Sequence, residues 1–302
     1  MSSPASGMPV RRIGLFGNPA KAELPPTVET IRRVCAATGV RLVASSDLAE
    51  VLPAGIPFVP NEQLAEAVDV IIALGGDGTM LRAARVLALS GVPLLGVNLG
   101  SLGYLTDVPL NELQPAMDAL ISGDYHLDRR SRVYCRVQRE GQPNGQTSAL
   151  NDLVVNMGPL PRALEMELIL DGDSLGPFLG DGVIVSTPTG STAYNLSAGG
   201  PICHWAVPCL IVSPICPHSL GMRPLIISGD TTVELRLHET GEGAVLTADG
   251  QKTQTLENGD RLIFSEADDE VALVKFAHST FYRVMRHKLN WGGPNRRGRR
   301  RV

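Results

Sequence analysis

Residues 74–79, with the sequence LGGDGT, combine residue types that suit phosphate chemistry. Three glycines in four residues leave backbone N–H groups uncovered, and such groups at the start of a helix bind phosphate. Asp77 lies among them, although a carboxylate repels phosphate, so its presence indicates that it handles a proton or a metal ion. The alternative is a tight turn without a ligand, in which Asp77 only accepts hydrogen bonds from nearby amides.

A second polar segment, residues 181–202, has the composition of a site for a ligand with many hydroxyls. A strand runs into a turn and a helix that carry Thr189, Ser191, Thr192, Tyr194, Asn195 and Ser197. A sugar needs such donors and acceptors, a base needs a flat face such as Tyr194, and Asp181 can accept a hydrogen bond. Ser191 or Thr192 can cap the helix. The alternative is a capped turn without a ligand.

The elements that must position the first segment alternate between strand and helix. Apolar runs predict strands at 13–17, 40–44, 68–74 and 93–97, and helical spacing predicts helices at 27–37, 80–89 and 110–121. This order favours a Rossmann-like α/β domain, a parallel sheet covered by helices with ligands at the carboxyl ends of its strands. Residues 98–105 (NLGSLGYL) follow one of these strands, and they form either another wall of the cleft or an ordinary loop.

From about residue 132 the pattern changes to short alternating runs separated by turn residues. The runs at 133–138, 153–155, 164–170, 232–237, 261–264 and 271–276 predict an all-β, antiparallel sandwich. Residues 280–288 have helical spacing, and this helix is expected to pack back on the first domain. We therefore expect an α/β domain at 10–125, a β-rich domain at 126–276, a C-terminal helix at 277–292, and a disordered basic tail at 293–302.

Composition narrows the class of protein. A chain of 302 residues is long enough for two domains, and its formal net charge of -4 gives no general reason for binding nucleic acid. We expect a cytoplasmic protein without a membrane segment, because we find neither a signal-peptide core nor 18 uninterrupted apolar residues. The five cysteines include no C-x-x-C pair, which argues against a disulfide framework or a zinc site.

Seven motifs together resemble the bacterial NAD kinases over residues 13–292. They are GGDGT, NLGSLGYL, LNDLVV, DGVIVSTPTGSTAYNLSAGGPI, PHSLGMRPL, DGQ and FYRVMRHKLNWG, in that order. GGDGT alone is weak, since diacylglycerol-type lipid kinases and phosphofructokinases carry similar turns, whereas the motif at 181–202 is specific.

The resemblance implies transfer of the terminal phosphoryl group of ATP, or of polyphosphate, to the 2'-hydroxyl of the adenosine ribose of NAD, forming NADP. Uncovered N–H groups at Gly75, Gly76, Gly78 and Thr79, with a divalent ion such as Mg²⁺, would position the phosphates and neutralise their charge. Asp77 resembles the family's proton acceptor, and a base contributes on the order of 10² to 10⁴ in rate.

The same resemblance implies further binding residues. Asn151 and Asp152 match a pair that holds ribose hydroxyls. Asp181, Thr192, Ala193, Tyr194, Asn195, Leu196 and Ser197 match dinucleotide contacts, and Arg162 and Gln251 match less specific positions. Asp152 stands where many members have glutamate, and Leu179 stands near where some place an arginine. Arg82, one turn after Thr79, faces phosphate or is an ordinary solvated helix residue.

Other readings remain open at this point. A lipid or sugar kinase would share the GGDGT turn, and a nucleotide-binding regulator would need no turnover. We interpret His204, His218 and His278 as structural, and Arg223 as supporting the site or a subunit contact. NAD and ATP are the expected partners, in a homo-oligomer, dimer or tetramer, because the family is usually oligomeric.

Overall fold

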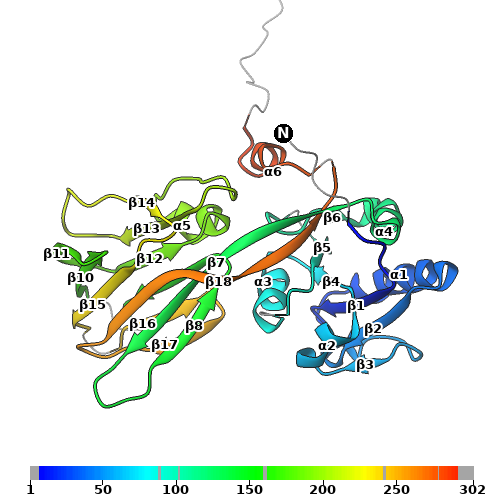
Figure 1. The fold of residues 1–302 in the computed structure, drawn as a ribbon, viewed down its shortest axis with the longest axis horizontal. Coiled ribbons are helices and arrows are strands. Elements are labelled where there is room, and N and C mark those ends of the chain that lie inside the picture. Colours follow the sequence, from blue (N-terminus) through cyan, green and yellow to red (C-terminus); the bar gives the residue numbers. More distant parts are fainter. Residues whose placement is uncertain are drawn as a thin grey trace, which may run out of the picture.

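The computed structural model describes residues 7–87, 90–100, 103–158, 162–240, 243–277 and 279–291. The chain forms two layered units that lie side by side, and two long strands, β7 (His126–Gln138) and β18 (Arg261–Lys275), run from one unit into the other (Figure 1). His278 and the basic tail at 293–302 lie outside the described residues.

The first unit is a parallel sheet with helices on both faces. Its strands pair in the order β3-β2-β1-β4-β5, and β6 pairs with β5. All residues of β4 are buried, as expected for a central parallel strand. Its alternate side chains face α1 and α4 on one side and α2 and α3 on the other. The α/β prediction is therefore confirmed. The elements of this unit are β1 (Arg12–Gly17), α1 (Leu24–Thr38), β2 (Arg41–Ser45), η1 (Ser46–Leu48), β3 (Phe58–Val59), α2 (Asn61–Ala67), β4 (Val70–Gly75), α3 (Asp77–Val86), β5 (Leu94–Asn98), β6 (Val108–Pro109), η2 (Leu110–Glu112) and α4 (Leu113–Ser122).

The second unit is a sandwich of two antiparallel layers, as the sequence predicted. One layer continues the first unit's sheet through β18 and β7, and the other has the order β14-β13-β12-β9-β16-β17. Apolar side chains of both layers fill the space between them. The elements are β8 (Gly145–Ala149), β9 (Asp152–Asn156), β10 (Leu164–Leu170), β11 (Asp173–Gly180), β12 (Gly182–Ser186), η3 (Thr189–Thr192), α5 (Tyr194–Ser197), β13 (Cys209–Ile215), β14 (Leu225–Ser228), β15 (Val233–Glu239), β16 (Val245–Ala248) and β17 (Lys252–Thr255).

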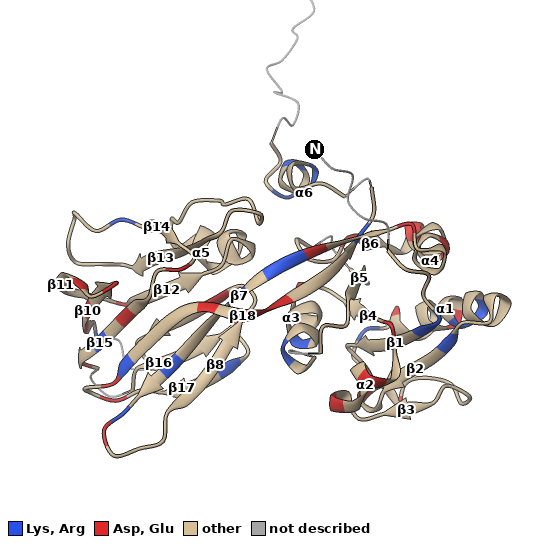
Figure 2. Ribbon diagram, in the orientation of Figure 1, with Lys and Arg blue, Asp and Glu red and all other residues tan. Residues whose placement is uncertain are grey.

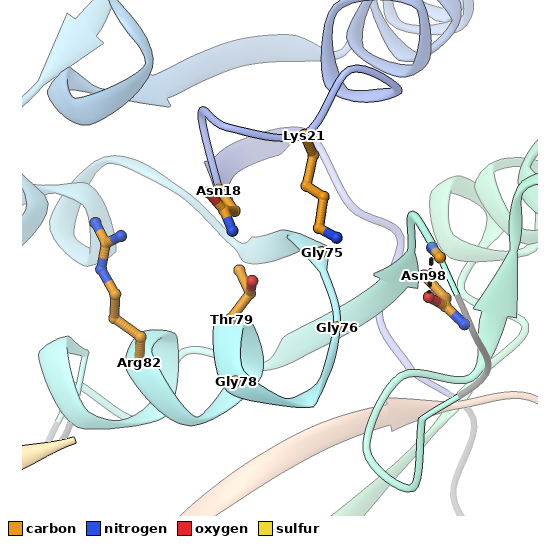
Figure 3. A pocket seen from close by; sticks show the side chains of 9 residues that line it. Asn18, Lys21, Gly75, Gly76, Gly78, Thr79, Arg82 and Asn98 are labelled. Carbon is orange, nitrogen blue, oxygen red and sulfur yellow. Dashed lines mark hydrogen bonds between the residues drawn. The ribbon is translucent and has the colours of Figure 1, made fainter. Parts of the chain in front are cut away.

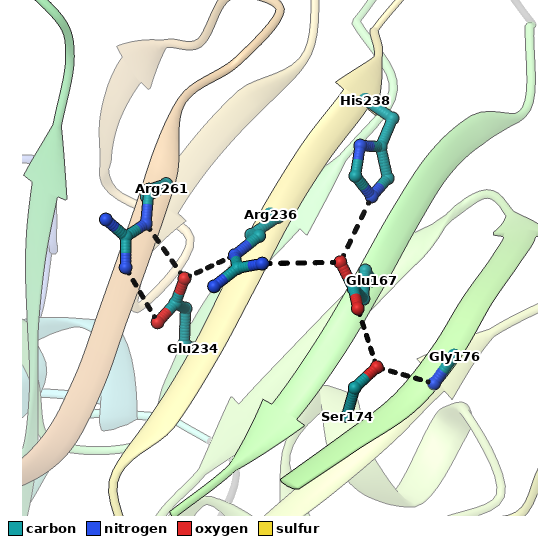
Figure 4. A network of polar contacts seen from close by, with 7 residues as sticks. All are labelled: Glu167, Ser174, Gly176, Glu234, Arg236, His238 and Arg261. Atoms are coloured by element: carbon teal, nitrogen blue, oxygen red, sulfur yellow. Dashed lines mark hydrogen bonds and ion pairs between the residues drawn. The ribbon is translucent and has the colours of Figure 1, made fainter. Parts of the chain in front are cut away.

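Charged side chains on neighbouring strands cover part of the sandwich surface (Figure 4). Glu234 accepts hydrogen bonds from Arg236 at 2.6 Å and Arg261 at 2.8 Å. Glu167 lies 3.8 Å from Arg236 and 3.4 Å from His238. These residues alternate with the buried apolar ones along β10 and β15, so one face of the layer is apolar and the other polar.

β18 corrects one expectation from the sequence. Residues 261–264 and 271–276 looked like two strands, but residues 261–275 form one strand of 15 residues paired along β7. The pairing register shifts between Glu266 and Glu270, at the polar stretch that interrupts the apolar alternation. Beyond this irregularity Leu273 pairs with Leu94 of β5. One 12-stranded sheet therefore spans both units.

The last helix, α6 (Phe281–Lys288), contacts both units. The Lys288 Nζ atom lies 5.0 Å from the centre of the Tyr104 ring, which agrees with the expectation that the helix packs on the first unit. Phe281 also packs on Trp205 of the second unit, with ring centres 4.8 Å apart. Arg130 stacks on the same Trp205 ring at 4.0 Å.

Charges of both signs occur on both units (Figure 2). Among the described residues there is no helix with the length and apolarity needed to cross a membrane. All five cysteines are free, and four of them are buried.

Candidate functional site

A cleft of about 360 Å³ opens above the glycine-rich turn, and we call it the glycine cleft (Figure 3). It lies at the carboxyl ends of three parallel strands, because Asn18 follows β1, Gly75 ends β4 and Asn98 ends β5. Its lining residues are Asn18, Lys21, Gly75, Gly76, Gly78, Thr79, Arg82, Asn98 and Gly100.

The turn packs so tightly that Gly75 has no room for a side chain. A Cβ atom there would lie 2.1 Å from the Thr79 hydroxyl oxygen. Helix α3 begins earlier than expected, at Asp77, and the Gly76 carbonyl accepts hydrogen bonds from the N–H groups of Thr79 and Met80, at 3.0 and 3.2 Å. The expectation of an uncovered N–H at Thr79 was therefore wrong, because that amide belongs to the first helical turn.

Two cationic side chains stand at the glycine cleft. Lys21 extends from the loop after β1 toward the turn (Figure 3). The Arg82 guanidinium forms an ion pair with Asp47 and lies 4.8 Å from the Phe16 ring centre. Arg82 therefore lines the cleft, and its contacts with Asp47 and Phe16 show that it is not an ordinary solvated helix residue. Sequence reasoning missed Asn18 and Lys21, and the position of Asn18 directly after a predicted strand was the signal that could have found it, whereas Asn98 begins the predicted wall at 98–105.

Asp77 is held by the loop between β5 and β6. Its carboxylate accepts hydrogen bonds from the backbone N–H groups of Tyr104, Leu105 and Thr106, at 2.8, 2.9 and 3.3 Å. We call residues 103–106 the cradle loop. A Cβ atom on Gly103 would lie 1.9 Å from the Asp77 Oδ1 atom, so only glycine allows this approach. The turn at 98–105 therefore forms a wall of the site, although residues 101–102 lie outside the described ones.

A second cleft of about 340 Å³ lies in the sandwich unit, and we call it the carboxylate cleft. It brings together the predicted residues Asn151, Asp152, Ala193 and Tyr194. The further lining residues are Val154, Asn156, Thr247, Asp249 and Gly250. The Tyr194 side chain is 43% exposed, so its ring is available to a ligand.

Two buried carboxyl groups define the electrostatics of this cleft. Burial, followed by the negative charge of Asp249, raises the pKa of Asp152 to about 7, against the opposing effect of the Tyr194 amide. Burial also raises the pKa of Asp249, which accepts hydrogen bonds from the backbone N–H groups of Leu150 at 3.0 Å and Asn151 at 2.7 Å. Asp249 adopts a positive φ of 50°, which brings its carboxylate under these amides. Sequence reasoning quoted the DGQ motif but missed Asp249 itself.

Gln251 connects the two units at the glycine-rich turn. Its Nε2 atom donates a hydrogen bond of 2.9 Å to the Gly78 carbonyl in the first turn of α3. Gln251 follows Gly250 of the carboxylate cleft, and Gly78 lines the glycine cleft. The two clefts therefore lie on either side of one hydrogen bond.

Several predicted residues lie outside both clefts. Asn195 is fully buried, and its side chain bonds to the carbonyls of Ser191 and Pro201 and to the Ser213 hydroxyl. The predicted caps were wrong, because Ser191 bonds to the backbone of Cys203 and α5 has only four residues and no side-chain cap. The other predicted residues that line neither cleft are Asp77, Arg162, Asp181, Thr192, Leu196, Ser197 and Gln251.

Local contacts indicate the roles of His204 and Arg223. His204 packs against Trp205 and Phe281, and its Nδ1 accepts a hydrogen bond from Ala206, which agrees with a structural role. Arg223 donates to carbonyls in its own loop. Within the described residues, no group of three His, Cys, Asp or Glu side chains could hold a metal ion.

Comparison with known proteins gives consistent matches along the chain. Residues 13–125 match the family described as the ATP-NAD kinase N-terminal domain, and residues 150–276 match the ATP-NAD kinase C-terminal domain. The chain is 40% identical to an NAD kinase of Moorella thermoacetica over 94% of this chain and 91% of that protein. It is also 40% identical to an NAD kinase of Syntrophotalea carbinolica, over 94% and 99% of the two chains.

Two solved structures have the same fold. Yeast NADH kinase in complex with NADH superposes with a TM-score of 0.88 at 24% identity, over 96% of this chain and 90% of that chain. An NAD kinase from Archaeoglobus fulgidus in complex with ATP superposes with a TM-score of 0.71 at 25% identity, over 92% and 97%.

Proposed function

The chain belongs to the NAD kinase family, and from this premise we propose that it transfers the terminal phosphoryl group of ATP or polyphosphate to the 2'-hydroxyl of the adenosine ribose of NAD, forming NADP. The observation that carries the proposal is the meeting of the two clefts at the glycine-rich turn. The hydrogen bond from Gln251 to Gly78 joins a cationic, glycine-lined cleft to a polar cleft that presents Tyr194. A phosphoryl transfer needs its donor and acceptor brought together in this way.

In this reaction the glycine cleft receives the phosphates of the donor. The N–H groups of Gly76 and Gly78 are the backbone donors we assign to them, and Lys21 and Arg82 supply positive charge. Asp77 accepts the proton of the 2'-hydroxyl while the 2'-oxygen bonds to the terminal phosphorus of the donor. The bond from this phosphorus to the bridging oxygen breaks, and the rest of the donor leaves with that oxygen. The amides of the cradle loop hold the Asp77 carboxylate in one orientation throughout.

The carboxylate cleft binds part of the dinucleotide. Asn151 and Asp152 accept hydrogen bonds from ribose hydroxyls, the Asn151 amide also donates one, and Tyr194 offers its ring to a base. We extend this surface to the remaining residues that match the family. They are Ala193, Thr192, Leu196, Ser197, Asp181, Arg162 and, through its backbone alone, Asn195.

A divalent metal ion, Mg²⁺, belongs to the proposal as a companion of the donor. Mg²⁺ keeps several waters and is commonly bound by one or two carboxylates together with substrate phosphates. The described residues offer no cluster of three metal ligands, so the ion would be held mainly by the donor phosphates and water in the glycine cleft. When bound, the ion would neutralise charge on the phosphates.

We test the base by substituting Asp77→Asn. We expect the variant to bind NAD and to form NADP more slowly by on the order of 10² to 10⁴, because the proton acceptor is lost. A coupled assay with Mg²⁺, NAD or NADH, and ATP or polyphosphate in turn measures NADP(H), and calorimetry measures NAD binding. Asp118→Asn, on the exposed side of α4, is the matched control and should keep full activity.

Full activity of the Asp77→Asn variant would remove the proposed base. Phosphorylation of diacylglycerol or a hexose phosphate, with NAD inert, would instead support the lipid or sugar kinase alternative. Binding of both nucleotides by the native protein without transfer of label from ATP to NAD would indicate a regulator.

The wider context is part of the same proposal. We propose domains at 10–125 and 126–276, a C-terminal helix at 277–292 and a tail at 293–302, which the matched ranges 13–125 and 150–276 support. We also propose a cytoplasmic homo-oligomer, dimer or tetramer, that binds neither nucleic acid nor membrane. Size-exclusion chromatography with light scattering tests the assembly.

A further inference from the structure

The cradle loop is itself anchored from the C-terminal end of the chain. Asp107 follows the loop directly, and its Oδ2 atom accepts hydrogen bonds from the Lys275 ammonium group at 2.5 Å and the Ser279 hydroxyl at 2.7 Å. The side chains of Lys275 and Asp107 are only 5% and 8% exposed. Two charges buried in contact form a strong mutual restraint, because either one alone would be left without a partner away from water.

Lys275 and Ser279 hold this position because of where β18 ends. Lys275 is the last residue of β18, which pairs with β7 along the sandwich and reaches β5 of the first unit at Leu273. Ser279 lies between β18 and α6, and its backbone N–H donates to the Phe276 carbonyl at 2.9 Å. The Asp107 contacts therefore tie the cradle loop to the strand that joins the two units.

Packing fixes part of the loop, because Leu105 is buried in the core and Thr106 is fully buried. A cavity of about 270 Å³ separates the loop region from α6, with Gly103, Asp107, Ser279 and Val284 among its lining residues. Dispersion contacts are missing on the side of this space, so the polar contacts of Asp107 restrain the backbone there.

We propose that Asp107, Lys275 and Ser279 are positioning residues that set the Asp77 carboxylate through the cradle loop. The three cradle amides are at 2.8, 2.9 and 3.3 Å from Asp77, and Thr106, which donates the longest of these bonds, is the residue next to Asp107. A shift of Asp107 is transmitted directly to the Thr106 amide and from there to the carboxylate. This inference rests on the proposed role of Asp77 as the base.

The test compares Asp107→Asn with a control that breaks a similar contact elsewhere. We expect kcat to fall by about 10- to 100-fold, since a displacement near 1 Å in an active site costs this much, while KM for NAD and for ATP stays within about twofold. Hydrogen–deuterium exchange at the amides of Tyr104, Leu105 and Thr106 should become faster. Asp260→Asn is the control, because Asp260 is 1% exposed, pairs with Arg139 and lies next to the opposite end of β18.

The control should lose stability without a change in kcat or in exchange at the cradle loop. Ser279→Ala should reduce kcat in the same direction and by less, and Ser279→Thr, which keeps the hydroxyl, should restore it. This pair decides the question if Asp107→Asn does not fold. A folded Asp107→Asn variant with native kcat, or an equal loss of kcat in Asp260→Asn, overturns the proposal. Asp77→Asn measured in parallel separates the two claims, since an active Asp77→Asn enzyme refutes the base, and an inactive one beside a fully active Asp107→Asn enzyme refutes only the positioning.

Discussion

Gly103→Ala should disable the reaction without touching either cleft. The added Cβ atom would lie 1.9 Å from the Asp77 Oδ1 atom and 2.4 Å from the Thr106 hydroxyl oxygen. Ordinary contacts begin at 3.4 Å, so the carboxylate or the loop must move by roughly 1.5 Å. The movement breaks at least one hydrogen bond to a charged acceptor, which contributes about 1.5–3 kcal/mol.

We expect kcat of the Gly103→Ala variant to fall by about 100-fold, because the base no longer meets the hydroxyl that it must deprotonate. Overpacking should lower the free energy of unfolding by about 1–3 kcal/mol, which leaves most of the protein folded. Initial rates of NADP formation at saturating NAD and ATP measure kcat, and urea unfolding measures stability. Gly221→Ala is the matched control, since a Cβ atom there has one neighbour, at 3.8 Å. Native kcat in a folded Gly103→Ala enzyme would refute the argument that the cradle loop fixes Asp77.

Two further predictions concern the clefts. Lys21→Ala should raise KM for the phosphoryl donor by about tenfold while KM for NAD stays constant, because a hydrogen bond to a charged group contributes about 1.5–3 kcal/mol. Lys252→Ala, on an exposed strand, is the control for the loss of charge. An unchanged donor KM in the Lys21→Ala variant would contradict the assignment of Lys21 to the donor. The raised pKa of Asp152 means that its carboxyl binds a proton more readily in the folded than in the unfolded chain, so its contribution to the free energy of unfolding decreases as pH rises from 3.8 to about 7. Urea unfolding of the unliganded protein at pH 5 and pH 8 measures this effect. Relative to the native chain, Asp152→Asn should be more stable at pH 8 than at pH 5 by a few kcal/mol, since each pKa unit corresponds to about 1.4 kcal/mol. A stability difference between the two proteins that is the same at both pH values would contradict the pKa shift.

Local patterns predicted those parts of the fold that a single periodicity determines. The strand at 164–170 and the alternation of strands and helices before residue 125 follow directly from apolar spacing. The continuity of β18 could not be predicted, because the polar residues at its irregular pairing with β7 look like a loop until the partner strand is known. The short elements β3 and α2 were missed for a similar reason, since two to seven residues carry little periodic signal.

The candidate site shows the same division between local and distant information. The glycine-rich turn and the Asn151-Asp152 pair are recognisable by themselves, and the structure places both in clefts. Lys21 lies 54 positions before Gly75 in the sequence, and no local pattern predicts that the two residues line the same cleft. Gln251 matched a ligand position by resemblance, and its side chain donates a hydrogen bond to the Gly78 carbonyl of the other unit.

The arrangement explains how a carboxylate and phosphates can share one turn. Gly76 and Gly78, on either side of Asp77, line the glycine cleft, where Lys21 and Arg82 provide positive charge. The Asp77 carboxylate accepts its hydrogen bonds from the cradle loop, so the amides that satisfy its charge are not the amides that the turn offers to a phosphate. Repulsion between the two anions is reduced because each has its own set of N–H donors. In the proposed reaction the acceptor hydroxyl would lie between the carboxylate and the donor phosphates, which is the order that proton removal and in-line phosphoryl transfer require.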